Sequence, residues 1–417
     1  MNKTRVVLAL LLLLGAANCA TWAVLVAGSN GFYNYRHQAD ICHAYQSLIK
    51  GGIPAANIIT FAYNDIANNA QNPIMGKIFN KPNGQDVYAG CVIDYQGADV
   101  TPQNFLSVLK QDSAAMKGKG TGRVLKSTNA DKVFINFSDH GAPGLIAFPS
   151  SYLYATDLTP VLTGMWTAKQ YQELVFYLEA CESGSMFNTF PTNQKLYALT
   201  AANPNESSWA TYCPPDDFIG GVEIGSCLGD LFSVNWMEDI DAQNTAKESL
   251  NAQFTTVQTL TTQSHVMQYG DLTFLTESVN NFVGNENPTK GTVNTEARNS
   301  TLHDSRDIKL QFLANRHAKL NTKETLAELN EEIASRKLYD DVFSAIKSVT
   351  GEVAFSSTTD FDCYKDMISS FEAACGRVSD YGLKYFRNLF NICASGAVNK
   401  NAVKDTFSKK CILAAIA

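Results

Sequence analysis

The sequence lacks any long apolar run beyond its N-terminus, and its charged residues lean toward acid rather than base. After the first 20 residues, no stretch reaches the roughly 18 apolar residues that a membrane-spanning helix needs, so we expect a soluble mature chain without a membrane anchor. The 33 Lys and Arg residues are outnumbered by 40 Asp and Glu residues, which gives a formal net charge of −7. Such a surface does not attract nucleic acid, so a nucleic-acid-binding function is excluded.

Metal-binding spacings and internal repeats are also missing. The 6 His and 10 Cys residues do not form the short paired spacings that are typical of zinc sites, so we expect neither a metal nor any other cofactor. No repeat of the kind that builds a solenoid or a propeller is present. At 417 residues, the chain is long enough for two or three domains.

The N-terminus has the pattern of a secretory signal peptide. Lys3 and Arg5 precede an apolar run at residues 6–14, and small residues follow up to Ala20. We predict that residues 1–20 are removed on maturation, with a buried N-terminal helix as the alternative. The signal peptide directs the chain into the secretory pathway, where disulfide bonds form.

The number of cysteines indicates that at least one thiol is free. Ten cysteines are present, and Cys19 leaves with the signal peptide, so an odd number remains. Cys42 falls in a helical pattern, and we expect it to be buried as a small apolar residue. Cys91 has no evident partner.

The first two-thirds of the chain alternates strand-like and helix-like segments, which predicts an α/β fold. Helices are expected at residues 38–50 and 103–116. The strand-like apolar runs lie at residues 22–28, 57–63, 132–137, 173–179 and 197–201. This alternation predicts a mostly parallel sheet flanked by helices. Ligands bind at the C-terminal edge of such sheets, so the loops after Gly28, Phe137 and Glu179 should share one rim.

The composition changes after about residue 275. Residues 279–308 are rich in Asn, Thr, Ser and Gly, which is typical of a flexible linker that proteases can reach. Residues 309–417 are helix-favouring, carry four cysteines and contain nothing that resembles a strand. We therefore predict an α/β domain at residues 21–278, a linker, and a separate all-α unit.

Two short motifs follow predicted strands and carry reactive side chains. His140 lies in the run Ser-Asp-His-Gly at residues 138–141, and Cys181 lies in Glu-Ala-Cys-Glu-Ser-Gly at residues 179–184. A thiol beside an imidazole can act as a nucleophile, and the N–H groups of Gly141 and Cys181 can form an oxyanion hole. Each residue alone has a structural alternative, because a histidine or cysteine at a strand end is commonly inert. The presence of His140 and Cys181 on the same rim of the sheet favours a catalytic dyad.

Eight longer runs resemble the legumain family, also called asparaginyl endopeptidases or vacuolar processing enzymes. These runs are VAGSNGFYNYRHQADICHAYQ (26–46), GQDVYAG (84–90), DVTPQNFLSVL (99–109), FSDHG (137–141), VFYLEACESGSM (175–186), TAANPNESSWATYC (200–213), LGDLFSVNWMED (228–239) and SHVMQYGD (264–271). The C-terminal unit is similar mainly in its cysteine spacing and helical character. The resemblance implies a caspase-like peptidase domain followed by a helical inhibitory prodomain.

The resemblance implies a role for each residue of the two motifs. Cys181 would be the nucleophile of a cysteine endopeptidase, and His140 its general base and acid. Asn34 would orient His140, and Gly141 would contribute to the oxyanion hole. Asp139 matches an aspartate that family members can convert to a succinimide, with an ordinary turn carboxylate as the alternative.

The family's asparagine pocket maps onto Arg36, His37, Glu179, Ser207, Ser208 and Asp230. A carboxamide has one acceptor oxygen and two N–H donors, so a selective pocket needs both a cation and carboxylates. Such a pocket rejects analogues that lack these groups by about 10⁴–10⁵-fold, and it should admit aspartate only when acid protonates that side chain. Without the resemblance, a structural ion pair between Arg36 and Asp230 is the plainer interpretation.

The resemblance also implies three disulfides. Cys213 and Cys227 would close a proline-containing loop, as in plant-type relatives, some of which also ligate peptides. Closing a loop of about 15 residues contributes about 3 kcal/mol in the chain-entropy model. The residues alone allow three connectivities for the last four cysteines. The pairs implied by the resemblance are Cys363–Cys393 and Cys375–Cys411.

The prodomain is expected to cap the cleft and to leave at low pH, after which the enzyme cuts its own chain after an asparagine. The candidate sites are Asn281, Asn285, Asn299, Asn315 and Asn321. Asn299 also begins the sequon Asn-Ser-Thr, so it is the preferred glycosylation site.

The leading hypothesis is an Asn-specific cysteine endopeptidase with transpeptidase capacity, destined for the lysosome, the vacuole or secretion. Its partners would be peptides and proteins with Asn at the cleavage position, its own prodomain, and cystatin-type inhibitors. One alternative is a GPI-anchor transamidase-like enzyme, which would usually carry a membrane helix and lack this prodomain. The other is a catalytically silent binding or storage protein, against which the intact dyad and pocket residues argue.

Overall fold

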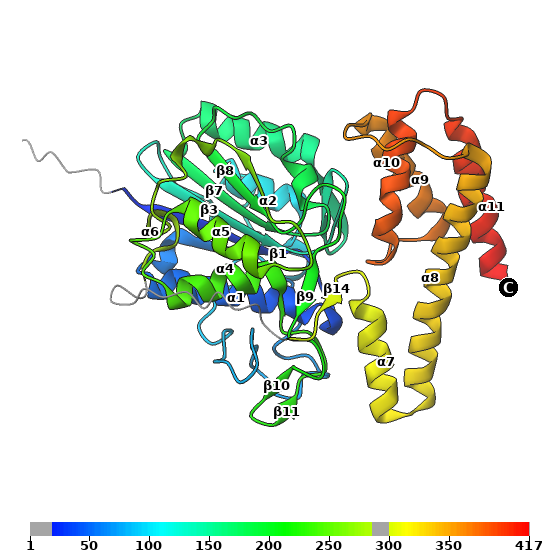
Figure 1. The fold of residues 1–417 in the computed structure, drawn as a ribbon, viewed down its shortest axis with the longest axis horizontal. Coiled ribbons are helices and arrows are strands. Elements are labelled where there is room, and N and C mark those ends of the chain that lie inside the picture. Colours follow the sequence, from blue (N-terminus) through cyan, green and yellow to red (C-terminus); the bar gives the residue numbers. More distant parts are fainter. Residues whose placement is uncertain (1–18, 286–299, 417) are drawn as a thin grey trace, which may run out of the picture.

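The computed structural model describes residues 19–285 and 300–416, and a six-stranded sheet forms the centre of its larger domain (Figure 1). In chain order, the strands are β1 (Thr21–Ala27), β2 (Ile58–Phe61), β3 (Lys132–Ser138), β7 (Glu173–Glu179), β8 (Leu196–Thr200) and β13 (Met267–Gly270). Their order across the sheet is β13-β8-β7-β3-β1-β2. All neighbours are parallel except β13, which is antiparallel to β8. The predicted mostly parallel sheet is confirmed.

Helices cover both faces of this sheet. Every residue of β3 and β7 is buried, as expected for strands that lie between two layers of helices. Helices α2 and α3 pack on one face, and α1, α4 and α5 pack on the other (Figure 1). The helices of this domain are α1 (Tyr35–Lys50), α2 (Pro102–Leu109), α3 (Ala155–Thr167), α4 (Leu231–Ala242), α5 (Leu250–Leu260) and α6 (Asn280–Val283).

Two expected helices differ from the observed ones at their ends. The helix expected at residues 103–116 is wrong beyond Leu109, because Gln111 adopts a φ of 60°, a left-handed conformation that ends a helix. Helix α1 begins at Tyr35 instead of residue 38. The earlier start matters for function, because it places Arg36 and the residues after it on one rigid helix.

Three smaller sheets complete the larger domain. The first contains β4 (Gly141–Ala142), β5 (Leu145–Phe148) and β6 (Ser151–Tyr154); the second contains β12 (Gly229–Asp230), β9 (Trp209–Thr211) and β14 (His303–Asp304); the third contains β10 (Phe218–Ile219) and β11 (Val222–Glu223). In the second sheet, β9 lies between β12 and β14. The segment that leads into the C-terminal unit is therefore tied to the larger domain by strand pairing.

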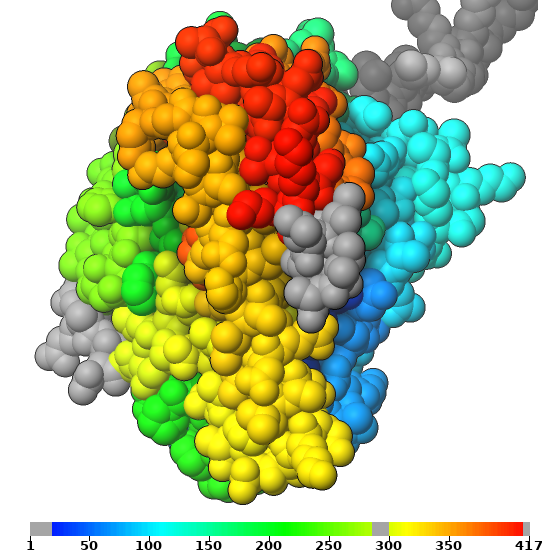
Figure 2. Space-filling model, turned by 90° about the vertical axis from the view of Figure 1, so that its right-hand side faces the viewer, coloured from blue at the N-terminus to red at the C-terminus, as the bar shows by residue number. Residues whose placement is uncertain are grey.

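The C-terminal unit is all-α, as predicted. Its helices are α7 (Ile308–Leu320), α8 (Lys323–Thr350), α9 (Phe361–Cys375), α10 (Phe386–Ala394) and α11 (Lys400–Ile416). Disulfides join Cys363 to Cys393 and Cys375 to Cys411, which are the pairs that the resemblance implies. Ala142 and Leu145 of the larger domain extend the apolar core of this unit. The unit spreads over one face of the larger domain (Figure 2).

The predicted linker at residues 279–308 is structured at both ends. Helix α6 buries Phe282 and Val283 against the sheet, and β14 pairs with β9. The signal peptide, except for its last two residues, and the glycosylation candidate Asn299 lie outside the described residues. Within the described ranges, no helix is long and apolar enough to cross a membrane.

One disulfide was not expected from the sequence. Cys42 on α1 is buried as expected, but it is bonded to Cys91, so the reading of Cys91 as partnerless is wrong. The two cysteines are 49 residues apart, and no local pattern links them. Cys213 and Cys227 are also paired. Of the cysteines that the structure describes, Cys19 and Cys181 are free.

Candidate active site

Strands β3 and β7 bring His140 and Cys181 to the same edge of the sheet. Their last residues, Ser138 and Glu179, are paired, and each reactive residue follows two positions later. The two segments touch beyond the strands, because a Cβ atom added to Gly141 would lie 2.3 Å from the carbonyl oxygen of Cys181. Any larger residue at position 141 would therefore push the two segments apart.

The imidazole of His140 is held through its Nε2 atom. Nε2 lies 2.9 Å from Oδ1 of Asn34 and 3.1 Å from Oδ2 of Asp380 in the C-terminal unit. Both oxygens are acceptors, so Nε2 carries the hydrogen. Nδ1 is buried and has no hydrogen-bond partner among the residues in the structure's described ranges. Nδ1 is therefore the ring nitrogen that can exchange a proton with a thiol or a leaving group.

The contact between His140 and Asp380 is an ion pair. Burial alone would lower the pKa of His140, but the neighbouring Asp380 carboxylate raises it overall. Burial would likewise raise the pKa of Asp380, but the charges of His140 and Arg36 lower it to about 2. In this state, the C-terminal unit supplies a counter-ion that favours the protonated imidazole.

The thiol of Cys181 is shielded from water. The residue is 1% exposed, and its Sγ atom accepts a hydrogen bond from the N–H of Ser208 at 3.3 Å. Burial raises the pKa of the thiol to about 11, although Arg306 partly opposes this effect. The thiol is therefore neutral while the C-terminal unit is docked, and a thiolate is the reactive form.

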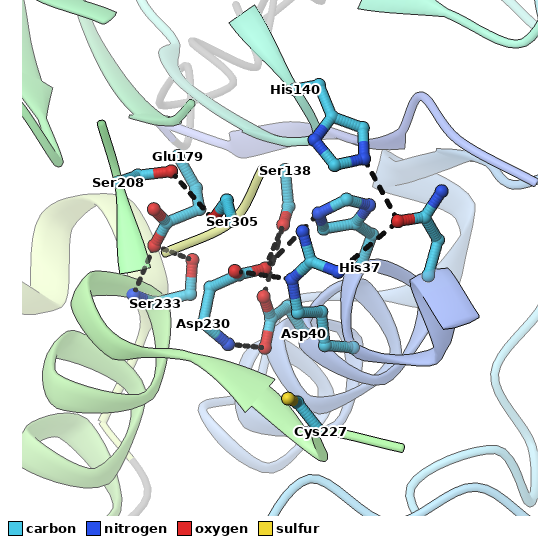
Figure 3. Close-up of polar contacts among 12 residues, drawn as sticks. His37, Asp40, Ser138, His140, Glu179, Ser208, Cys227, Asp230, Ser233 and Ser305 are labelled. Carbon is cyan, nitrogen blue, oxygen red and sulfur yellow. Dashed lines mark hydrogen bonds and ion pairs between the residues drawn. The ribbon is translucent and has the colours of Figure 1, made fainter. Parts of the chain in front are cut away.

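A buried pocket of opposite charges lies beside His140 (Figure 3). Arg36 donates from Nε to Oδ1 of Asp230 at 2.8 Å, while its Nη2 atom is buried without a partner among the described residues. Glu179 accepts from the backbone N–H and the hydroxyl of Ser233 through Oε2, at 2.9 and 3.0 Å. Its Oε1 atom is buried and likewise has no partner in the described part of the chain. Burial and the charge of Asp230 raise the pKa of Glu179 well above its usual range, so Oε1 is an acceptor only when this carboxyl is ionised. In that form, one donor and one acceptor of the pocket await a ligand.

Three further residues that the resemblance implies for the asparagine pocket do not all lie together. His37 lies in the pocket, with Nδ1 at 2.6 Å from the hydroxyl of Ser29 and Nε2 at 3.5 Å from Oδ2 of Asp230. Ser208 lies between the thiol and Ser305. Ser207 lines a separate cavity of about 640 Å³ next to the C-terminal unit. The structure therefore brings His37 and Ser208, but not Ser207, to the centre of the site.

Asp139 lies behind the dyad against tightly packed backbone. An added Cβ atom on Gly28 would lie 2.4 Å from its Oδ2 atom. Burial raises the pKa of Asp139 to about 7, even though His140 opposes the shift. Asp139 is therefore a buried carboxyl that keeps its proton near neutrality.

The segment around β14 covers the thiol. His303 pairs with Ala210 in an antiparallel register, and the N–H of Ser305 donates to the carbonyl of Ser208 at 3.1 Å. The Ser305 hydroxyl lies 3.2 Å from that of Ser208. Arg306 then forms an ion pair with Glu182, the residue after Cys181. The backbone edge of β9 is therefore occupied in this state.

Several residues of the site were missed by sequence reasoning. They are Asp40, Ser138, Ser233, Ser305, Arg306 and Asp380. Only Asp40 left a signal, because it follows Arg36 by four residues on a helix and so shares its face. The other positions depend on how distant segments pack together.

The donor atoms of His37, Asp139 and His140 lie within 4.8 Å of one another, which is close enough by geometry to hold a metal ion. His37 and His140 already have the partners that a dyad and pocket need. We therefore assign this cluster no metal-binding role, and the expected absence of a metal or other cofactor stays a prediction.

Comparisons with known proteins agree with this geometry. The sequence pattern of the Peptidase C13 family matches residues 21–297, and that of the legumain prodomain matches residues 327–411. Legumain of Mus musculus is 42% identical over 390 residues, which cover 89% of this chain and 88% of that protein. Vacuolar-processing enzyme beta-isozyme 1 of Oryza sativa subsp. japonica is 43% identical over 406 residues, with 90% and 81% covered. Among solved structures, caspase-1 from Spodoptera frugiperda covers 62% of this chain and 88% of its own at 10% identity and a TM-score of 0.37, a likeness too weak to carry an argument.

Proposed function

Because this chain belongs to the Peptidase C13 family and is a legumain-type cysteine endopeptidase, we propose that it cleaves peptide bonds after asparagine. The observation that carries the proposal is a pair of buried atoms, Nη2 of Arg36 and Oε1 of Glu179, which have no partner among the residues that the structure describes. Leaving a buried polar group unpaired costs about 1–3 kcal/mol, so each atom favours a ligand that completes it. A carboxamide completes both, because its oxygen accepts and its nitrogen donates.

The proposed reaction uses Cys181 and His140. The Cys181 Sγ atom attacks the backbone carbonyl carbon of the asparagine, and Nδ1 of His140 takes the thiol proton and then passes it to the leaving amine of the next residue. The backbone N–H groups of Gly141 and Cys181 stabilise the oxyanion, a contribution of about 10²–10³-fold for each donor. Water then hydrolyses the thioester. A peptide amine that arrives before water would form a new peptide bond instead, which is the proposed ligase activity.

The same pocket is proposed to accept aspartate only in acid. An ionised aspartate side chain would be repelled by the carboxyl groups of Glu179 and Asp230, and it has no N–H to donate. Protonation removes the charge and supplies one donor, so the acid form imitates asparagine. Cleavage after aspartate should therefore appear as the pH falls toward the pKa of a free aspartate, about 3.9.

The segment around β14, which leads into the C-terminal unit, and the legumain prodomain itself are proposed to inhibit the enzyme together. The segment around β14 occupies the edge of β9 on which an extended substrate would pair. Asp380 pairs with His140 and so opposes the loss of its proton. An enzyme in this state lacks both an open binding edge and a free base, which fits a zymogen that matures when the prodomain leaves.

Activation is proposed to start with a cut after Asn321. Of the candidate asparagines within the described ranges, Asn321 is exposed, whereas Asn281, Asn285 and Asn315 are partly buried. Asn321 also ends α7 with a φ of 44°, at the turn before α8. An exposed turn is the kind of segment that a protease can pull into its cleft.

Three further proposals rest on the family and the sequence. Asp139, whose carboxyl is buried behind the dyad, is a candidate for succinimide formation. Asn299 is a candidate for glycosylation, and the secretory pathway would deliver the protein to a lysosome or vacuole. Cystatin-type inhibitors are the proposed protein partners besides substrates.

The experiment that tests the function uses the full chain, brought to acid pH and offered matched peptides that differ only in having Asn, Asp or Gln before a fluorogenic group. We expect self-shortening, a new C-terminus at residue 321 by mass spectrometry, and cleavage of the Asn peptide at least 100-fold faster than that of the Gln peptide at pH 6. Equal rates for Asn and Gln would overturn the proposed specificity. Activity that needs an added protein partner would favour a transamidase, and no activity at any pH would favour a silent binding protein.

A further inference from the structure

A third carboxyl group, that of Asp40, lies behind the pocket and has no role in the steps above. Asp40 is fully buried on α1. Its Oδ1 atom accepts from Nδ2 of Asn80 at 2.7 Å and faces the N–H of Asp230 at 3.4 Å. Its Oδ2 atom accepts from the hydroxyl of Ser138 at 3.1 Å, and the same hydroxyl lies 3.5 Å from Oδ2 of Asp230 (Figure 3). Asp40 and Asp230 are therefore neighbours that share a donor.

The charges around Asp40 do not balance if every carboxyl is ionised. Three carboxyls face one another here, Asp40 from α1, Glu179 from β7 and Asp230 from β12. The facing cation is Arg36, also on α1, and its Nε atom donates to Asp230. His37, whose Nε2 lies 3.5 Å from Oδ2 of Asp230, adds no charge, because burial lowers its pKa well below the usual value. An uncompensated buried charge costs several kcal/mol, so protons must remain on some of these carboxyls.

Asp40 is well placed to keep such a proton. Its partners Asn80 and Ser138 are neutral, whereas Asp230 has Arg36 as a counter-ion. Asn80 is fixed in turn, because it also donates to the carbonyl of Leu228 at 2.9 Å. Burial, together with the charges of Asp230 and Glu179, raises the pKa of Asp40 well above its usual range, in agreement with the geometry.

We propose that Asp40 is a specificity-determining positioning residue, which in its neutral form hydrogen-bonds Asp230 and thereby fixes the Arg36–Asp230 pair for a carboxamide. This inference rests on the proposed asparagine specificity. Asp40 does not touch the substrate and acts through Asp230. When Asp40 loses its proton at higher pH, a further negative charge appears behind the pocket and disfavours an aspartate side chain more strongly than an asparagine.

Two substitutions separate positioning from bulk stability. Asp40→Ala removes both the hydrogen bond to Asp230 and the side chain held by Asn80, and we expect kcat/KM for the Asn peptide to fall about 10- to 100-fold. Asp40→Asn keeps the size and can still accept from Asn80 while donating to Asp230, so it should recover most of that loss. Because the amide never ionises, the ratio of Asp to Asn cleavage in Asp40→Asn should persist to higher pH than in the wild type.

The test measures kcat/KM for the Asn and Asp peptides between pH 4 and 7.5 in the acid-processed full chain of each variant. Ser47→Ala is the matched control, because Ser47 is a buried polar residue of α1 that contacts Asp241 rather than the pocket. The rate of Cys181 alkylation by iodoacetamide reports whether the nucleophile is intact. The control should match the wild type in the pH profile of the Asp-to-Asn ratio.

Two results would overturn the inference. One is an Asp40→Asn variant as impaired as Asp40→Ala, because the neutral, hydrogen-bonded form would then not be what the pocket needs. The other is an Asp-to-Asn profile that superimposes on the wild type in Asp40→Asn. If Asp40→Ala does not fold, the profile of Asp40→Asn decides alone. A wild-type enzyme that does not cleave the Asn peptide would instead refute the proposed function. Failure of the Asp40 inference and failure of the proposed function are therefore distinguishable.

Discussion

The two sides of the catalytic dyad are built in opposite ways. On the pocket side, the side chains of Arg36 and Asp230 are 0% and 1% exposed, and both belong to the peptidase domain. On the other side, Asp380 reaches His140 from the prodomain, and its side chain is 24% exposed. Breaking a fully buried ion pair is costly, whereas water can replace a partly exposed contact. The comparison indicates that the contact on the pocket side is built into the peptidase domain, whereas the contact with the prodomain is the easier one to break.

The test with the largest expected effect asks whether Cys181 is the nucleophile for both substrate cleavage and self-processing. Replacing Cys181 by Ala should lower turnover of the Asn peptide by roughly 10⁶-fold, the loss that is typical when a covalent nucleophile is removed. The same variant should stay full-length at acid pH, because self-shortening needs the same thiol. Progress curves and mass spectrometry check both points, and an unchanged melting temperature shows that the fold is intact. Residual turnover above about 1% would mean that another group attacks the substrate.

The next test changes the pocket side of the dyad, at Glu179. Glu179→Gln should keep the contact with Ser233 but present an N–H instead of Oε1 to the pocket. Asparagine cleavage should then fall about 10- to 100-fold, because a donor faces the carboxamide nitrogen. Steady-state kinetics at pH 6 with Asn and Asp peptides measure the change. Glu248→Gln, a buried residue outside the pocket, is the control and should keep the wild-type preference.

The third test weakens the contact between Asp380 of the prodomain and His140. The direction of the expected effect follows from the pKa shifts of these two residues. The pKa of Asp380 is depressed to about 2, so its contribution to docking is present above about pH 4 and is lost as the pH falls toward 2. The pKa of His140 is raised, so its contribution is present below its usual value near 6.5 and is lost as the pH rises through the raised value. The pair therefore holds the prodomain in the mildly acidic range.

Asp380→Asn should weaken prodomain docking by about 10-fold, since one partner of a charge pair is lost. Self-processing of the full chain should then begin at a higher pH than in the wild type. The fraction processed after a fixed time, measured from pH 3.5 to 7.5, checks this expectation. An unshifted curve would show that Asp380 does not hold the prodomain.

The smallest effect is expected at the exposed rim of the same interface. Lys365 of the prodomain lies 2.9 Å from Asp157, and the two side chains are 34% and 42% exposed. Exposed pairs contribute about 0.2–1 kcal/mol, so Asp157→Asn should move the processing curve less than Asp380→Asn does. This substitution also removes an acidic charge from the interface, which makes it the matched control for Asp380. A larger shift from Asp157→Asn would reverse the proposed ranking.

The sequence predicted the parts of the fold that depend on local patterns. The strand expected at residues 173–179 is β7 with the same bounds, because a continuous apolar run between breakers is a local signal. The positions of His140 and Cys181 just beyond neighbouring strands followed from the same logic. The antiparallel edge strand β13 was not predicted, because three of its four residues are only partly buried and it lacks a continuous apolar run.

The contacts that the sequence did not predict all join distant segments. Cys42 meets Cys91 only because the loop that carries Cys91 packs on α1. Asp380 lies in the connection between α9 and α10, where no periodic pattern marks it. Its contact with His140 exists only after the prodomain docks, so no property of the local sequence could reveal it.

Helix α1 joins functions that are usually carried by separate loops. Asn34 immediately precedes this helix, and Arg36, His37 and Asp40 lie in its first two turns. Each residue of an α-helix turns the side-chain direction by about 100°, so a single insertion between positions 34 and 40 would rotate the groups on one side of it by about 100° relative to those on the other. The disulfide at Cys42 anchors the same helix. The residues proposed for bond breaking and those proposed for side-chain choice thus share one helix, which tolerates substitution better than a change in length.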